Sequence, residues 1–395
     1  MNNHSLRFFF LNVGHFLDHL FLLVFATAAL RLTLEWDMSY AELIPYATPA
    51  FVAFGVCAIP SGWLADKWSR EGMMVVFFIG IGACAILSGF ANTPVQMAIC
   101  LTLVGVFASI YHPVGLAMVV QGLEKTGIPL AINGIWGNMG VASAALLTGY
   151  LVDTAGWQAG FIIPGAISIL FGLAFWWFVA SGRCKVEEAP KAAAKANEIS
   201  KAMLIRLFGI ILFTTAIGGL VFQSTTFALP KIFDERLAEM AGTATMVGWY
   251  AFIAFTIAAF AQLVVGYLVD RHSIRAVFAV VALLQAVFFY FMIHLQGVAA
   301  LLVAIAFMLA VFGQIPINDV LVGRIAKSAW RSRAFALRYI VTFSVSATAV
   351  PIIAWIHSTW GFGTLFSVLA VAALIIFVAT LFLPGRETQA QAATA

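Results

Sequence analysis

Long apolar runs recur along the whole chain, separated by short breaks that carry charged residues, glycine or proline. Each run has about 20 residues, the length that an α-helix needs to cross a hydrocarbon layer of roughly 30 Å. A helix also satisfies its backbone hydrogen bonds internally, as lipid requires. The pattern therefore predicts an all-α polytopic membrane protein. Twelve spans are expected, at residues 7–33, 42–65, 73–91, 95–121, 128–152, 157–180, 203–230, 243–267, 275–294, 298–322, 333–356 and 361–383.

One sizeable connection interrupts this series: SGRCKVEEAPKAAAKANEISK, residues 181–201, which is rich in Ala, Lys and Glu. It divides the predicted spans six and six. The expected organisation is an N-terminal six-helix bundle at 1–180, a cytoplasmic linker at 181–202, a C-terminal six-helix bundle at 203–385 and a cytoplasmic tail at 386–395.

Composition and charge agree with this class. Hydrophobic residues make up 63% of the 395 residues and charged residues only 10%, a balance outside the range of soluble domains. The net charge of +4 comes from bases spread over short loops, so it does not indicate nucleic-acid binding. With both termini and the linker cytoplasmic, only Arg31, Lys231 and Arg236 of the 21 Lys and Arg residues fall on the outer side, as the positive-inside rule favours.

Ionisable residues interrupt the first predicted span, in NVGHFLDHLFLLVF. His15, Asp18 and His19 are spaced by three and four residues and share one helix face. At 1.5 Å per residue from Arg7 they lie roughly 12 to 17 Å deep, where an ionised group costs at least about 3 kcal/mol. Asp18 could couple transport to protons, the imidazoles could contact a polar or anionic substrate, or His15 and His19 could bind a transition metal. A purely structural polar network between helices is the further alternative.

The fourth and fifth predicted spans offer partners for these groups. SIYHPVG carries Tyr111 and His112 beside Pro113, which breaks the helical hydrogen-bond ladder. The fifth span carries Asn133 and Asn138, the second of these at a depth similar to that of His112. The sequence predicts one polar cluster at a common level, formed by Asp18, His19, His112 and Asn138.

The second half of the chain is less polar in its spans. The amides of Gln223, Gln314 and Asn318 are candidates for substrate contact. Arg338, about six residues into the eleventh predicted span, could reach the membrane surface or pair with Asp319 near an inner gate.

A short motif repeats at symmetry-related span ends. GWLAD at Gly62–Asp66 ends the second span, and GYLVD at Gly266–Asp270 ends the eighth. GYLVD also occurs at Gly149–Asp153, where it closes the fifth span on the opposite membrane face, as an inverted repeat requires.

The first of these motifs continues as GWLADKWSR, which resembles the loop signature of the major facilitator superfamily, with Ser69 at a glycine position. The second copy, GYLVDRHSIR, resembles it as well. The resemblance implies two six-helix bundles that rock about a central site, with the signature loops as gates. The gating residues it implies are Asp66, Lys67, Arg70, Asp270, Arg271 and Arg275, to which Asp319 and Arg338 are added.

Within that superfamily, GHFLDHLF, SIYHPVG and WGNMG resemble segments of the fosmidomycin-resistance type of transporter. This narrower resemblance implies efflux of a small polar or amphiphilic solute by a proton antiporter of the bacterial inner membrane. Import of a transition metal, a metal chelate or an organic anion stays open as the alternative.

The expected function is thus proton-coupled secondary active transport by alternating access. A phosphate-binding loop, a nucleophile elbow and a zinc-protease motif are all missing from the sequence, so an enzyme is not expected. No cofactor is expected. The expected partners are a small-molecule substrate, protons and membrane lipid, and the chain is expected to be a monomer.

Overall fold

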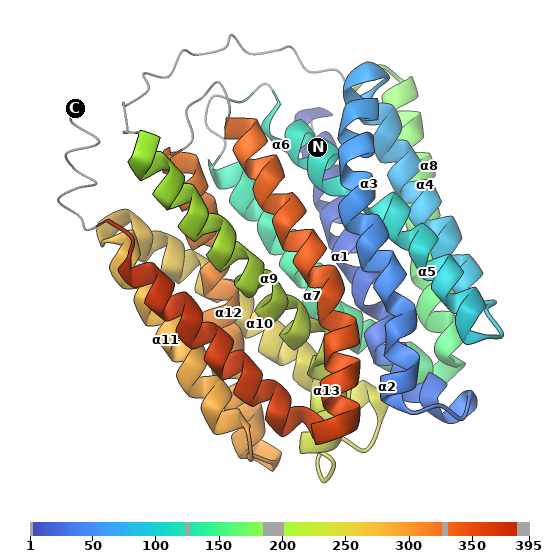
Figure 1. Ribbon diagram of the computed structural model, residues 1–395. Coiled ribbons are helices and arrows are strands. Elements are labelled where there is room, and N and C mark those ends of the chain that lie inside the picture. Colours follow the sequence, from blue (N-terminus) through green and yellow to red (C-terminus); the bar gives the residue numbers. More distant parts are fainter. Residues whose placement is uncertain (1–2, 122, 124–126, 185–200, 326–330, 385–395) are drawn as a thin grey trace. The chain divides into compact units, whose positions relative to one another are not determined.

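The computed structural model describes residues 3–121, 123, 127–184, 201–325 and 331–384, and all regular elements in these ranges are helical (Figure 1). The predicted tail and most of the predicted linker lie outside them. The elements before the linker are α1 (Asn3–Glu35), α2 (Tyr40–Leu43), η1 (Ile44–Ala47), α3 (Thr48–Lys67), α4 (Arg70–Ser88), α5 (Pro94–Ala108), η2 (Tyr111–Gly115), α6 (Leu116–Val120), α7 (Gly127–Ala155) and α8 (Trp157–Ala180). Those after it are α9 (Lys201–Arg236), α10 (Ala244–Arg271), α11 (Ile274–Met292), α12 (Gly297–Ile325) and α13 (Arg331–Leu381).

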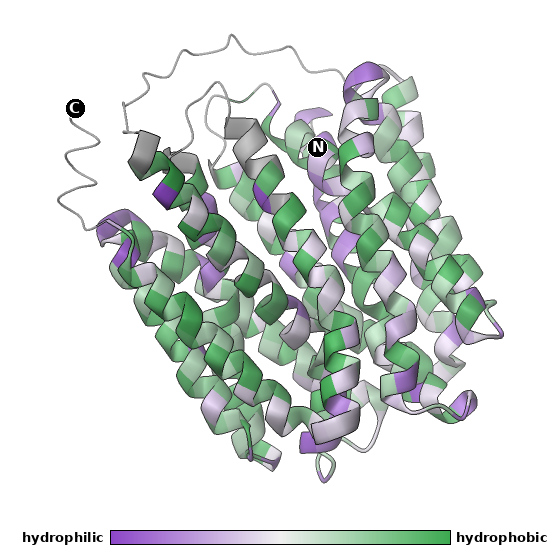
Figure 2. Cartoon of the chain, in the orientation of Figure 1, coloured by the Kyte–Doolittle hydropathy of each residue, from purple (hydrophilic) through white to green (hydrophobic). Residues whose placement is uncertain are grey.

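In the described part of the chain, eleven helical segments are long and apolar enough to cross a membrane. Figure 2 shows hydrophobic residues along most of their length. The count differs from the predicted twelve because the last two predicted spans form one helix, α13, with a bend at Gly361 (Figure 1). Gly361 has φ 75° and ψ −178°, a conformation that glycine adopts without steric cost. The predicted break at residues 357–360 lies beside this bend, and the count of twelve stays a prediction.

Local sequence signals explain where several helices begin. The side chain of Ser69 accepts a hydrogen bond from the backbone N–H of Gly72 (3.0 Å) at the start of α4. The side chain of Thr93 caps α5 in the same way, and Pro94 occupies its first turn. These are the residue types that satisfy or remove the free N–H groups of a helix start.

The fourth predicted span is irregular in its middle. α5 ends at Ala108, and the five residues of η2 form a π-helical turn around Pro113 before α6 begins. Proline has no N–H to donate and clashes with the preceding turn, and a wider turn accommodates it. The predicted break of the ladder at Pro113 is therefore present, and it turns Tyr111 and His112 out of the regular α-helical register.

The chain divides into two compact units. The first comprises Met1–Lys191 with Phe227–Phe255, and in it α1 packs along α7, α4 along α8 and α3 along α5. Glycines allow close approach at these contacts: a Cβ at Gly140 would lie 2.1 Å from the carbonyl oxygen of Phe16, and one at Gly105 would lie 2.1 Å from that of Ala50. Small residues at helix contacts are how membrane proteins bring helix backbones together.

The second unit comprises Ala192–Thr226 with Thr256–Ala395. Within it α11 packs against α12 and α13. Its core contains fully buried apolar side chains from four helices, namely Ile211, Phe278, Ile317 and Ile376.

Gly140→Ala tests the contact between α1 and α7. The added Cβ would overlap the carbonyl oxygen of Phe16, so we expect a lower midpoint of thermal unfolding in detergent. Gly134→Ala in the same helix is the matched control, because a Cβ there meets nothing within 4 Å. Alanine favours a helix over glycine by about 1 kcal/mol, so the control should not lose stability. Equal midpoints for the two variants would contradict the close approach.

Candidate functional site

Polar side chains of α1 are buried in the first unit. Asp18 is 0% exposed, Asn12 is 4% exposed and His15 is 7% exposed. His19 is partly buried. The spacing of these residues places them on one side of α1, the side that packs against α7 and η2. The structure thus buries the ionisable residues of the first predicted span among protein rather than leaving them toward lipid.

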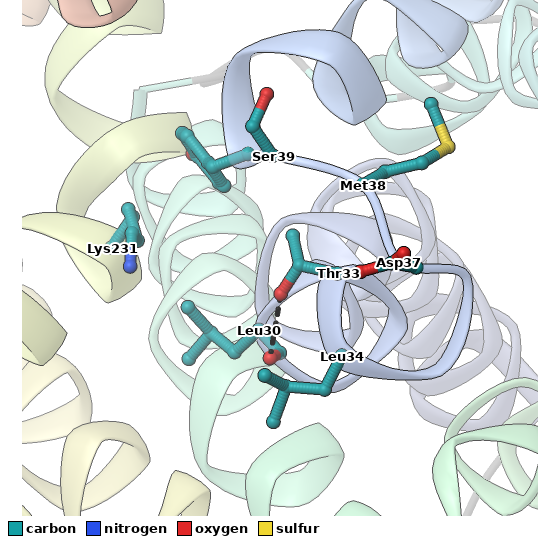
Figure 3. A pocket seen from close by; sticks show the side chains of 8 residues that line it. Leu30, Thr33, Leu34, Asp37, Met38, Ser39 and Lys231 are labelled. Carbon is teal, nitrogen blue, oxygen red and sulfur yellow. Dashed lines mark hydrogen bonds between the residues drawn. The ribbon is translucent and has the colours of Figure 1, made fainter.

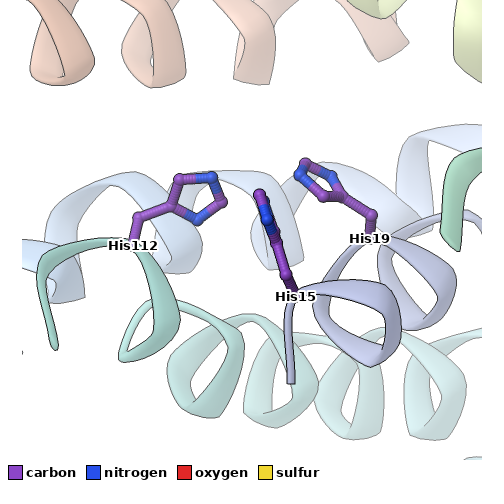
Figure 4. Close-up of side chains that lie close together, drawn as sticks. All are labelled: His15, His19 and His112. Atoms are coloured by element: carbon purple, nitrogen blue, oxygen red, sulfur yellow. The ribbon is translucent and has the colours of Figure 1, made fainter. Parts of the chain in front are cut away.

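Three imidazoles meet in this unit (Figure 4). The ring centroids of His15 and His19 are 5.0 Å apart, and His112 of η2 lies 5.4 Å from each of them. One ligand nitrogen from each ring can be chosen so that all three lie within 4.8 Å of one another. The predicted proximity of His112 to the α1 residues is confirmed.

A carboxylate accompanies the imidazoles. Oδ2 of Asp18 lies 3.4 Å from Nδ1 of His112, and the Asp18 side chain is fully buried. This separation is longer than a normal hydrogen bond. An acid and a base that share a buried site can compensate each other's charge, which lowers the cost of keeping both in the membrane interior.

Asn133 of α7 is the centre of a hydrogen-bond network. Nδ1 of His15 donates to its backbone carbonyl oxygen at 2.7 Å, and its side-chain Nδ2 donates to Oδ1 of Asn12 at 2.9 Å. Nδ2 also donates to the hydroxyl of Tyr111 at 2.9 Å, and that hydroxyl donates to the carbonyl oxygen of Leu11 at 2.8 Å. The Tyr111 ring stacks on His15 with centroids 4.8 Å apart. One asparagine therefore ties together α1, η2 and α7.

Asn138 is not part of this network, although its depth along the sequence predicts a cluster with Asp18, His19 and His112. Its side chain is buried, and Nδ2 has no hydrogen-bond partner among the described residues. Positions 133, 137 and 140 of α7 face α1, and a helix turns by about 100° per residue, so position 138 is rotated roughly 140° away from 133. The role predicted for Asn138 stays a prediction.

Three residues that make buried contacts in the first unit were not among the predicted site residues. Asn12 lies one helical turn before His15, so the same spacing rule that groups His15 with Asp18 could have found it. Gly137 keeps space for His15, because a Cβ there would lie 2.6 Å from its Nε2. Arg7, 4% exposed, donates to Oε1 of Gln121 at 2.6 Å, a contact that no local pattern signals.

The predicted amides of the second unit are buried, namely Gln223, Gln314 and Asn318. Gln314 accepts a hydrogen bond from Nε2 of Gln285 at 2.7 Å, a partner that the sequence analysis did not single out. Arg338 donates to Asp319, so the predicted pairing is confirmed. The Arg338 side chain is 8% exposed and that of Asp319 is 41% exposed.

The two signature loops differ in their contacts. In the first, Arg70 pairs with Asp66 at 2.9 Å, with both side chains more than one-third exposed, and Lys67 is exposed at the end of α3. In the second, the guanidinium of Arg271 lies 3.9 Å from the ring centroid of Tyr267. Exposed pairs contribute at most about 1 kcal/mol, so they can form and break at little cost. The gating roles of these loops, including those of Asp270 and Arg275, stay predictions.

The third copy of the repeated motif has a partner in the first unit. Asp153 accepts hydrogen bonds from the backbone N–H of Thr245 (2.6 Å) and from its hydroxyl, in the first turn of α10. Nearby, a Cβ at Gly149 would lie 2.2 Å from the carbonyl oxygen of Ala244. A carboxylate at a helix start is stabilised by the free N–H groups there. Asp153 is therefore a further gate candidate that the motif indicated and the predicted gating set omitted.

A pocket of about 430 Å³ lies at the end of α1, lined by Leu30, Thr33, Leu34, Asp37, Met38, Ser39, Tyr40 and Lys231 (Figure 3). Lys231 pairs with Asp234 at 2.6 Å and lies 3.6 Å from Glu235. The one cation of the pocket is thus already neutralised. None of the predicted site residues line it, so the polar centre around the imidazoles is the stronger candidate site.

Sequence comparison matches this architecture to a known family. The family model described as Major Facilitator Superfamily matches residues 8–240 and 211–395, which together cover nearly the whole chain. The chain belongs to the Major Facilitator Superfamily. It is accordingly a multi-pass membrane protein of a family of transporters, which act on small molecules and are generally monomeric.

Individual members of the superfamily are more distant. The chain is 23% identical over 309 residues to the 4-hydroxybenzoate transporter PcaK of Pseudomonas putida, covering 70% of this chain and 68% of that protein. It is 22% identical over 278 residues to a gallate transporter of Pseudomonas putida, covering 62% and 61%. The chain spans about two thirds of the length of these relatives.

Solved structures share the fold. The inward-open xylose transporter XylE from E. coli has a TM-score of 0.75 at 13% identity, covering 95% of this chain and 96% of that one. A bacterial homologue of the human lysosomal transporter Spinster, inward-facing and unoccupied, has a TM-score of 0.72 at 16% identity, covering 96% and 95%. At these identities the likeness shows the superfamily fold.

Arg338 is more deeply buried than Asp319, so removing either partner of this pair should affect stability differently. Asp319→Asn removes the carboxylate beside a buried guanidinium, whereas Arg338→Met leaves a carboxylate that is 41% exposed. We expect Asp319→Asn to lower the thermal unfolding midpoint more than Arg338→Met does.

The double variant separates the pair from its parts. Removing both charges should recover most of the stability lost in Asp319→Asn, because the double variant no longer buries a guanidinium. Thermal unfolding of the four proteins, followed by tryptophan fluorescence in detergent, measures this. The prediction would be contradicted if both single variants lowered the unfolding midpoint equally and the double variant lowered it by the sum of the two.

Proposed function

We propose that this chain is a proton-coupled secondary active transporter that moves a small organic acid across the membrane by alternating access. The observation that carries the proposal is the buried polar centre of the first unit, with Asp18 fully buried beside His112. A charged group inside a membrane helix costs at least about 3 kcal/mol, and such groups mark substrate and ion pathways.

The cargo class is supported by the relatives. Two of them are named for 4-hydroxybenzoate and for gallate, both organic acids. An anion that approaches the polar centre is repelled by Asp18 unless a cation neutralises that carboxylate, and a proton is the smallest such cation. Neutralisation of Asp18 therefore favours binding of the anion, which is the condition for moving both together.

Direction follows from the sign of this coupling. A proton and an anion that bind together are taken up together when the outside is acidic, which is the import alternative of the sequence analysis. Efflux of a polar or amphiphilic solute in exchange for protons, as the fosmidomycin-resistance resemblance implies, needs the opposite sign. We propose the first and test it against the second.

The membrane arrangement is also part of the proposal. α13 would cross twice, on either side of the bend at Gly361, which gives twelve spans in two six-helix bundles. The Lys and Arg distribution supports cytoplasmic termini, and relatives from Pseudomonas putida support a bacterial inner membrane as the location. Asp66 with Arg70 and Asp319 with Arg338 are the charge pairs proposed to open and close the gates.

Vesicles containing the purified chain test the coupling. With an acidic exterior we expect labelled 4-hydroxybenzoate to accumulate above the level in protein-free vesicles, and a protonophore should abolish the difference. Asp18→Asn should remove gradient-driven accumulation while exchange of labelled for unlabelled cargo continues, because the amide is permanently neutral.

Asp37→Asn is the matched control, since the same change there affects an exposed carboxylate after α1, and it should accumulate cargo like the wild type. Accumulation by Asp18→Asn equal to the wild type would remove Asp18 from the coupling. Accumulation only with an acidic interior would establish exchange against protons and overturn import. If neither gradient drives accumulation of 4-hydroxybenzoate or gallate, the proposed cargo class is wrong.

A further inference from the structure

The three imidazoles of the first unit are placed as a set of metal ligands would be. His15 and His19 are one helical turn apart in α1, and His112 comes from the π-helical turn η2. Their ligand nitrogens lie within 4.8 Å of one another (Figure 4). Three histidines, two of them four residues apart on a helix, are a donor set that Zn²⁺ and similar divalent ions accept.

The hydrogen bond of His15 determines which of its ring nitrogens carries the proton. A backbone carbonyl can only accept, so the contact of 2.7 Å with Asn133 places a proton on Nδ1 of His15. In the neutral ring the lone pair is then on Nε2. A metal-binding histidine usually donates its other nitrogen to a carbonyl or carboxylate oxygen in this way, which fixes the ring and raises its basicity.

His112 has an oxygen in the corresponding place. Oδ2 of Asp18 lies 3.4 Å from its Nδ1, which leaves Nε2 as the nitrogen away from the carboxylate. The pairing resembles the carboxylate–histidine arrangement behind many zinc ligands. Two of the three imidazoles therefore have an oxygen near Nδ1, one from a backbone carbonyl and one from a carboxyl group.

The surroundings hold these rings in place. Tyr111 stacks on His15, and the ring of Phe54 meets that of His112 edge-on at 5.7 Å. Gly137 has no side chain, and a Cβ there would lie 2.6 Å from Nε2 of His15, the nitrogen with the lone pair. Any larger residue at 137 would push this ring from its position.

The groups in the cluster favour a cation over an anion as the ligand. Ring nitrogens that lie this close together can accept hydrogen bonds or bind one cation, and a neutral imidazole offers little to an anion. Asp18, fully buried, adds a carboxyl group beside them. A divalent cation can bind ring nitrogens and is also favoured by a carboxylate nearby.

We propose that His15, His19 and His112 bind a divalent first-row transition metal such as Zn²⁺, with Asp18 and the Asn133 carbonyl orienting two of the rings. Nitrogens on a tetrahedral zinc ion lie about 3.3 Å apart, so the rings close in on the metal by roughly 1 Å or more. Three protein ligands leave a fourth position for water or for a carboxylate oxygen of a cargo. This inference goes beyond the proposed transport function, because it concerns the imidazoles and needs no cargo.

Metal binding by the purified full chain tests the proposal. After treatment with a chelator and its removal, we expect one Zn²⁺ per chain by calorimetry. Co²⁺ should give the intense visible absorption of a four-coordinate ion. His19→Gln and His112→Gln should each abolish the Co²⁺ spectrum while the protein elutes as a single species in gel filtration.

Three further variants separate this site from other metal binding. Asp18→Asn should weaken the metal about 10- to 100-fold, as loss of an orienting partner does. Gly137→Ala should weaken it by displacing His15. His294→Ala is the control, because His294 is exposed in the second unit, and its affinity and Co²⁺ spectrum should equal those of the wild type.

The outcomes are distinct from those of the transport test. Zn²⁺ binding that survives in both His19→Gln and His112→Gln, or a Co²⁺ spectrum of six-coordinate type, would overturn the metal site. If Zn²⁺ binds as expected but vesicles move no organic acid, the proposed function fails and the metal site stands. If vesicles accumulate cargo in the presence of chelator and no metal binds, the metal site fails alone.

Discussion

The scarcity of hydrogen-bond partners inside a membrane is the constraint on which the first unit depends. A polar side chain in the hydrocarbon region needs a hydrogen-bond partner on another helix, because leaving it without one destabilises the fold. Asn133 supplies such partners to Asn12, His15 and Tyr111 at once. Its backbone carbonyl is accessible to His15 because the helices approach closely at Gly137 and Gly140. The polar centre and the helix packing are therefore one arrangement.

The π-helical turn at Pro113 complements this arrangement from a second segment. A regular α-helix would direct Tyr111 and His112 about 100° apart, at fixed heights. In the wider turn that is present, the Tyr111 hydroxyl reaches α1 and α7, and the His112 ring meets His15, His19 and Asp18. Irregular helix geometry of this kind is frequent at functional sites. Here its cause is local and can be read from the proline.

Much of this could be predicted from the sequence because it depends on spacing along one helix. The shared face of His15, Asp18 and His19, the break at Pro113 and the Arg338–Asp319 pair follow from periodicity, residue type and depth. The central place of Asn133 in the hydrogen-bond network, and the contact of Gln285 with Gln314, depend on how one helix is rotated against another. Rotation is set by side-chain packing and glycine contacts between distant segments, which the pattern of a single run does not contain. The roles of the site residues stay predictions.

The glycine contacts of α7 have a consequence for motion. At Gly140 a backbone carbonyl of α1 occupies the space that a Cβ would take, so the main chains of the two helices are in direct contact. Sliding or rotation of one helix on the other would bring main-chain atoms into steric overlap. We therefore expect α1 and α7 to move together. In a conformational cycle that opened the protein to one side and then the other, the residues of these two helices, His15, Asp18, His19 and Asn133, would keep their backbone positions relative to one another while access to them alternates.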